Sequence, residues 1–205
     1  ASNTPGAVGV LRLFLSHFDG KLASQWCPGN DDISATFTTP SLTSIATFTG
    51  TAGLFAPKPA LVHEGGRWHA YYLLPNGILY HRVSSNLGAS WSAASIVFSG
   101  GVVAGDLFAL HLPADDLHLV QFSTVTGGNV RLAGAARTGS GAWQVWSPHT
   151  SASGWLPAGM VRIGDNQVRQ FWTAWTPPPR RTHFASIDCT VAPTGALDSR
   201  SAAPT

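Results

Sequence analysis

The stretch "SSNLGASW", Ser84–Trp91, lies between two apolar runs and has the pattern Ser-x-Asn-x-Gly-x-Ser-Trp. This pattern favours a tight turn, because asparagine can hydrogen-bond backbone groups within its own turn and glycine tolerates a positive φ. The preceding segment, "RWHAYYLLPNGILYHRV" (Arg67–Val83), holds two aromatic-rich runs around Asn76-Gly77, a pair typical of type I′ hairpins. The region therefore predicts two antiparallel strands followed by a second turn.

Three further hairpins are predicted along the chain. They turn at Asp19-Gly20, at Gly127-Gly128 and at the triple proline Pro177–Pro179. Aligning the four hairpins brings the octamer Ser84–Trp91, the second in chain order, into register with three others, namely "NDDISATF" (Asn30–Phe37), "ARTGSGAW" (Ala136–Trp143) and "SIDCTVAP" (Ser186–Pro193). The starts are spaced by about 50 residues, which is within the range of β-propeller blades.

The repeat predicts an all-β fold. Apolar runs of strand length alternate with turn residues, and the chain contains 22 Gly and 14 Pro. Each repeat would hold an inner strand, a hairpin and an outer strand, and such a sheet needs neighbours to cover its faces. We expect a β-propeller-like arrangement of about four four-stranded blades in one domain, residues 1–205, with repeats near 1–52, 53–101, 102–153 and 154–205.

The octamers resemble the Asp-box of sialidase-type (BNR-repeat) β-propellers, Ser-x-Asp-x-Gly-x-Thr-Trp, which lies between the third and fourth strands of a blade. The second octamer matches best and carries Asn86 in place of the aspartate, and the other copies are degenerate. The resemblance implies a structural role for the matching residues, which are Asp32, Ser84, Asn86, Gly88, Trp91, Trp143 and Asp188. The segment "PKPALVHEGGRWHAYYLL" is more loosely similar to blades of five-bladed glycoside hydrolases of the arabinanase and fructosidase type.

A hydrolytic centre is not expected. Glycosidases generally use two carboxyl groups that flank the scissile bond. The sequence has a single glutamate, Glu64, which falls in the hairpin turn "HEGG" at a blade edge. Asp106 is the carboxylate that we expect near the central funnel, at the start of an inner strand. We therefore predict no catalytic residues and favour a protein that is not an enzyme.

Histidines suggest a metal site without completing one. In "LHLPADDLHL" a tight turn would pair Leu112 with Leu117, so that His111 faces His118 beside Asp115 and Asp116. Two histidines can ligate zinc or copper, but a zinc site generally has three or four protein ligands. Two half-exposed strand histidines are the simpler interpretation, and we predict neither a metal nor a cofactor.

Ligand-binding candidates lie beside turns. Exposed aromatic rings can stack on sugar rings, and arginine presents planar donors suited to carboxylate or sulfate. The two arginines of the set follow the stiff triple proline. The candidates are Trp146, Trp155, Trp175, Arg180, Arg181 and Asp106.

Composition limits the partners. Basic side chains number 12 and acidic ones 10, so the chain lacks the concentrated positive charge that nucleic acid requires. No apolar stretch is long enough to insert into a membrane. We predict an extracellular or surface-associated module, a virion included, that recognises a glycan or surface polysaccharide without catalysis. A structural or attachment subunit with protein partners and a glycoside hydrolase are the two alternatives.

Two cysteines fall at related positions of the first and fourth repeats. Cys27 and Cys189 each follow or end a third strand in the alignment. In a closed ring the first and fourth blades are neighbours. We therefore predict a circular arrangement and, in an oxidising compartment, a disulfide between the two.

Overall fold

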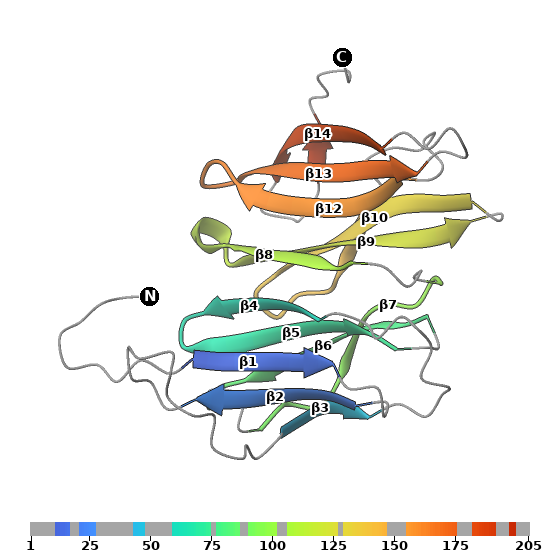
Figure 1. Ribbon diagram of the computed structural model, residues 1–205. Helices are drawn as coiled ribbons and strands as arrows, with labels where there is room; N and C mark the ends of the chain where they lie inside the picture. The colour runs from blue at the N-terminus through green and yellow to red at the C-terminus, as the bar shows by residue number, and fades with distance from the viewer. Residues whose placement is uncertain are drawn as a thin grey trace.

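The structure is a computed structural model, and it describes residues 11–16, 21–27, 43–47, 59–74, 77–86, 90–101, 106–126, 129–146, 155–175, 182–191 and 197–199. Fifteen strands in these segments form four antiparallel sheets (Figure 1). No helix in the described segments is long and apolar enough to cross a membrane. The predicted all-β, propeller-like fold is confirmed.

Each sheet is a meander in which strands adjacent in the chain are hydrogen-bonded neighbours. The first sheet contains β1 (Leu11–Ser16), β2 (Lys21–Cys27) and β3 (Thr43–Thr47). The second contains β4 (Ala60–Glu64), β5 (Arg67–Leu73), β6 (Leu79–Ser84) and β7 (Ser95–Phe98). The third contains β8 (Phe108–Leu112), β9 (Leu117–Thr126), β10 (Asn129–Thr138) and β11 (Gln144–Trp146). The fourth contains β12 (Trp155–Arg162), β13 (Gln167–Trp175), β14 (Thr182–Val191) and β15 (Leu197–Ser199).

The four predicted hairpins are confirmed by the pairing of their strands. β1 pairs with β2, β5 with β6, β9 with β10 and β13 with β14, all antiparallel. Gly77 has a φ of 74°, as the turn between β5 and β6 requires. The predicted pairing of His111 with His118 across β8 and β9 is also confirmed.

The second, third and fourth sheets pack face to face, and the second and third carry apolar side chains on both faces. Along β5, Tyr71 and Leu73 contact the third sheet, whereas Ala70 and Tyr72 belong to a separate cluster on the opposite face. Buried residues between the second and third sheets include Val62, Tyr71, Leu73, Leu79, Val97, Val120, Phe122, Ala133 and Ala135. The layer between the third and fourth sheets includes Leu112, Leu117, Leu119, Leu132, Ala136, Val168, Trp172, Cys189 and Val191.

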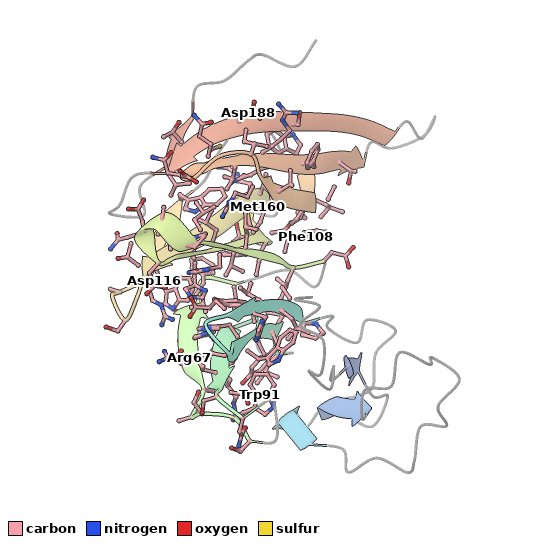
Figure 2. All side chains as sticks on the ribbon, turned by 90° about the vertical axis from the view of Figure 1, so that its left-hand side faces the viewer. Arg67, Trp91, Phe108, Asp116, Met160 and Asp188 are labelled. Atoms are coloured by element: carbon pink, nitrogen blue, oxygen red, sulfur yellow. The ribbon has the colours of Figure 1, made fainter. Side chains whose placement is uncertain are left out.

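The stack is open, and the predicted ring is wrong for this structure. The first sheet (β1–β3) and the fourth sheet (β12–β15) lie at opposite ends of the stack in both views (Figures 1 and 2). Cys189 is a buried free thiol in β14, so the predicted disulfide with Cys27 is not formed. The prediction failed because sequence spacing gives the order of the sheets but not the angle between them.

The second octamer forms a turn that its own side chains bridge. Asn86 Oδ1 accepts hydrogen bonds from Ser84 Oγ at 2.9 Å and from the Ser90 backbone N–H at 2.9 Å. Asn86 Nδ2 donates to Ser90 Oγ at 2.8 Å. Trp91 packs beside Tyr72 at the end of this turn, and Gly88 lies outside the described residues.

The third and fourth octamers differ from this arrangement. The third ends in the turn between β10 and β11, where Trp143 packs against the core between the second and third sheets. The fourth does not form the predicted turn, because its first six residues lie within β14. Asp188 is instead an exposed strand residue whose carboxylate pairs with Arg169 at 2.7 and 2.9 Å. Asp32 lies outside the described residues.

Replacing Trp91 with alanine should lower the free energy of unfolding by about 3–5 kcal/mol, because the truncation removes a packed aromatic ring. Urea denaturation followed by circular dichroism measures this loss. An unchanged stability together with lost ligand affinity would contradict the structural role.

Candidate functional site

Two hairpin ends meet at one edge of the stack. The β4–β5 turn joins Glu64 to Arg67 through two glycines of positive φ, Gly65 at 51° and Gly66 at 78°. The β8–β9 connection is a short 3-10 turn followed by Asp116. Figure 2 shows Arg67 and Asp116 on the same edge of the molecule, contributed by neighbouring sheets. Polar side chains from both sheets therefore converge here.

A layer of imidazole rings closes this end of the core between the second and third sheets. His69 on β5, His81 on β6 and His118 on β9 are all buried. His69 Nδ1 lies 3.0 Å from His81 Nε2, and the rings of His69 and His118 lie 4.3 Å apart between centroids. The histidines lie on the same strand faces as core residues such as Tyr71 on β5 and Val120 on β9, which are further along these strands.

Burial governs the protonation of this layer. Burial, the positive charge of Arg137 and the neighbouring imidazoles lower the pKa of His81 to about 3. The pKa of His118 is lowered to about 3, with burial again the largest cause. Both rings are therefore neutral at neutral pH.

Tyr71 fixes the orientation of His118. Its hydroxyl lies 2.9 Å from His118 Nδ1, which leaves Nε2 facing Glu64 Oε1 at 3.9 Å. Tyr71 is fully buried, and this burial raises the pKa of its hydroxyl well above 10. The phenol is therefore a positioning group and is unsuited to act as a nucleophile.

Four side chains bring donor atoms to one point. His111 Nε2 lies 2.9 Å from Glu64 Oε2 and 3.1 Å from Asp116 Oδ1. The donor atoms of Glu64, His111, Asp116 and His118 all lie within 4.8 Å of one another. Such a set of two imidazoles and two carboxylates is able to hold a divalent cation.

The backbone around Asp116 is specialised for this placement. Asp116 is left-handed, with φ 47° and ψ 46°, a conformation that aspartate tolerates better than most residues. Its carbonyl accepts a hydrogen bond from Gly139 N–H at 2.8 Å. A Cβ on Gly139 would lie 3.3 Å from Asp116 Oδ2, so glycine leaves room for the carboxylate.

A polar pocket of about 370 Å³ opens beside this cluster. It is lined by charged and hydroxyl-bearing side chains of the second and third sheets, including Glu64, Arg67, Ser92, Ser95, Asp116, Arg137 and Ser140. The guanidinium carbon of Arg137 lies 4.7 Å from the ring centre of Trp143, a contact that holds the arginine in place. A second hollow, of about 540 Å³, shares Glu64 and His111 and includes Arg162.

Of the predicted ligand-binding side chains, the two that the structure describes, Asp106 and Trp146, lie away from this cluster. Asp106 is exposed and precedes β8, at the opposite end of that strand from His111. Trp146 on β11 is partly buried against the core between the third and fourth sheets, over Gly134. Trp155 and Trp175 lie at the paired ends of β12 and β13, and their side chains are not described. Arg180 and Arg181 fall outside the described residues.

The sequence interpretation missed the contribution of the second sheet. It paired His111 with His118 and placed Asp116 in their turn, but it treated Glu64 as a turn residue and did not consider His69 or His81. A usable signal was present, because Glu64 is the last residue and His111 the last but one of equivalent first strands in adjacent repeats.

No protein-family model matches the chain, and no curated protein matches it. Solved structures do. The K499G mutant of NanB sialidase from Streptococcus pneumoniae is 14% identical, with a TM-score of 0.53 over 78% of this chain and 25% of that one. The intramolecular trans-sialidase from Ruminococcus gnavus is 12% identical, with a TM-score of 0.50 over 80% and 36%. The chain shares the β-propeller fold.

A third similar structure is the catalytic domain of the GH62 α-L-arabinofuranosidase from Coprinopsis cinerea. It is 15% identical, with a TM-score of 0.50 over 92% of this chain and 62% of that one. The chain thus spans less than two thirds of the length of each of these three structures, and only a quarter of the first.

We expect the stability of the fold to decrease as the pH falls below 6.5, the ordinary pKa of histidine, toward about 3, the pKa of folded His81. In this interval His81 is protonated in the unfolded chain but not in the folded chain, which favours unfolding. Above the interval His81 is neutral in both states, so this loss of stability is absent. Urea denaturation in EDTA from about pH 7.5 to about pH 4.5 measures the slope. His81→Gln should have a shallower slope, and identical slopes would refute this assignment.

Proposed function

We propose that this chain is a glycan-recognition module of one domain, residues 1–205, that binds a sugar without cleaving it. The binding site is the polar pocket beside the histidine layer. An extracellular or surface-associated location belongs to the same proposal. The β-propeller fold is compatible with this function, and the similar solved structures include a sialidase and an arabinofuranosidase.

The chemistry of the pocket supports sugar binding. A volume of about 370 Å³ falls within the range of small-ligand pockets. Arg67 and Arg137 offer paired donors, and the lining serines can both donate and accept hydrogen bonds. Adjacent sugar hydroxyls present the complementary donors and acceptors.

Both carboxylates of the pocket converge on one imidazole nitrogen, and this geometry favours binding over hydrolysis. An inverting glycosidase separates its two carboxyl groups by about 6.5–9.5 Å and a retaining one by about 5–5.5 Å. The donor atoms of Glu64 and Asp116 lie within 4.8 Å, with His111 Nε2 in contact with both. This leaves no space for a sugar ring between them.

Replacing Arg67 with alanine should weaken glycan binding about 10- to 100-fold, because a hydrogen bond to a charged group contributes about 1.5–3 kcal/mol. The side chain is exposed at the start of β5, so folding should be unaffected. A glycan array that includes sialylated, arabinan and xylan oligosaccharides would identify a ligand, and calorimetry would measure its affinity.

Arg162→Ala is the matched control, since Arg162 is also exposed at a strand end but lines the other hollow. Its affinity should equal that of the unaltered protein. Equal losses in both variants would exclude the pocket as the binding site, and release of sugar from any array ligand would refute the non-catalytic role.

The segment between β13 and β14, which the sequence predicts to be a stiff proline-rich loop, is a second candidate for ligand binding. Replacing Arg180 and Arg181 with alanine should leave stability unchanged and weaken the binding of acidic glycans, because exposed loop charges contribute little to folding. Affinity measured at low and high salt tests this role. If the affinity and its salt dependence are unchanged, these two arginines do not bind the ligand and the segment only connects β13 to β14.

A structural subunit of a larger assembly is the second candidate function. The fourth sheet ends the stack and exposes large apolar side chains, among them Val161 and Phe171. These residues lie on neighbouring strands β12 and β13, where a further sheet could pack. Sedimentation analysis across a concentration series distinguishes an assembling subunit from a monomeric module.

A further inference from the structure

We propose that Glu64, His111, Asp116 and His118 form a binding site for a divalent transition metal ion of the zinc class, which links the second and third sheets. Glu64 comes from the second sheet, and the other three side chains come from the β8–β9 hairpin of the third. Glu64, Asp116 and His118 also line the pocket proposed for the glycan, but binding of the ion does not require a glycan.

The spacing of the donor atoms is close to that of tetrahedral coordination. Bonds of about 2.0–2.2 Å from zinc to nitrogen and oxygen place neighbouring ligand atoms about 3.3–3.6 Å apart. Here the distances are 2.9 Å from His111 Nε2 to Glu64 Oε2, 3.1 Å from His111 Nε2 to Asp116 Oδ1, and 3.9 Å from His118 Nε2 to Glu64 Oε1. With one oxygen from each carboxylate, the four donor atoms lie within 4.8 Å of one another. Binding a single tetrahedral ion therefore draws the widest pair together by about 1 Å.

Hydrogen bonding alone satisfies this arrangement poorly. His111 Nε2 carries at most one hydrogen, yet it faces carboxylate oxygens of both Glu64 and Asp116. One N–H group aligns well with only one of them, and two nearby carboxylates repel each other. A divalent cation between the four side chains attracts both carboxylates and accepts the lone pairs of both rings.

The surrounding residues hold the ligands in place. Tyr71 contacts Nδ1 of His118, the arrangement in which the second ring nitrogen of a metal-bound histidine is fixed by an outer partner. His69 supports Glu64 from within the core, with Nε2 3.2 Å from Glu64 Oε1. This nitrogen is buried and makes no well-aligned hydrogen bond among the described residues.

The mixed donor set selects the class of metal. Imidazole nitrogen suits zinc, copper, iron and nickel, whereas calcium and magnesium prefer six or more oxygen ligands. Four protein ligands also complete a tetrahedral zinc site, as in structural rather than catalytic centres. The ion therefore has the role of an inter-sheet link.

The test titrates the metal-free chain with Zn²⁺ by calorimetry, with Co²⁺ to report coordination through its visible absorption. We expect one ion per chain and a tetrahedral Co²⁺ spectrum. His111→Gln should weaken Zn²⁺ binding by more than about 100-fold, beyond the 10- to 100-fold loss typical of outer partners. Tyr71→Phe should show that smaller loss.

Asp116→Asn covers the case in which His111→Gln fails to fold. Asp116 has a side chain 59% exposed, and asparagine tolerates its left-handed backbone. Asp115→Asn, in the same turn, and His63→Gln, on the exposed side of β4, are the controls and should bind as the unaltered chain does. Failure to bind Zn²⁺, or undiminished binding by Asp116→Asn and His111→Gln, would overturn the proposal.

Discussion

The inner sheets of this molecule carry apolar side chains on both faces, and each face needs a neighbouring sheet to exclude water. β5 shows the constraint most clearly, because Tyr71 faces the third sheet and Tyr72 faces the opposite way. A strand buried on both sides is stable only within a stack. Face-to-face packing of the second, third and fourth sheets therefore excludes water from these surfaces, and it brings the β4–β5 and β8–β9 hairpins to the same edge (Figure 2).

The polar cluster follows directly from this stacking. The strand faces that meet in the core carry tyrosine, valine and phenylalanine side chains. At the edge, the same faces carry His69 and His118. Ordered strands fix the imidazoles more firmly than mobile loops would, and the short turns deliver Glu64 and Asp116 to the same point. A site on the boundary between two sheets can bind a ligand and also hold the sheets together.

Features coded by local chemistry could be predicted from the sequence. The hairpin at Asn76-Gly77 and the cross-strand pairing of His111 with His118 depend on turn residues that lie close together in the chain. The contact of Glu64 with His111 joins two repeats, and no local pattern encodes the angle at which repeats pack. The same limitation explains why the predicted ring and the predicted pairing of Cys189 with Cys27 were wrong. The turn predicted for the fourth octamer failed for another reason, because its degenerate residues continue a strand.

The most direct test of a cation site between the second and third sheets is anomalous diffraction at the zinc absorption edge, from crystals grown with Zn²⁺. We expect a peak enclosed by Glu64, His111, Asp116 and His118, with the imidazole of His118 held by Tyr71. A map without a peak at this position, or with zinc only on exposed histidines such as His63, would contradict the account.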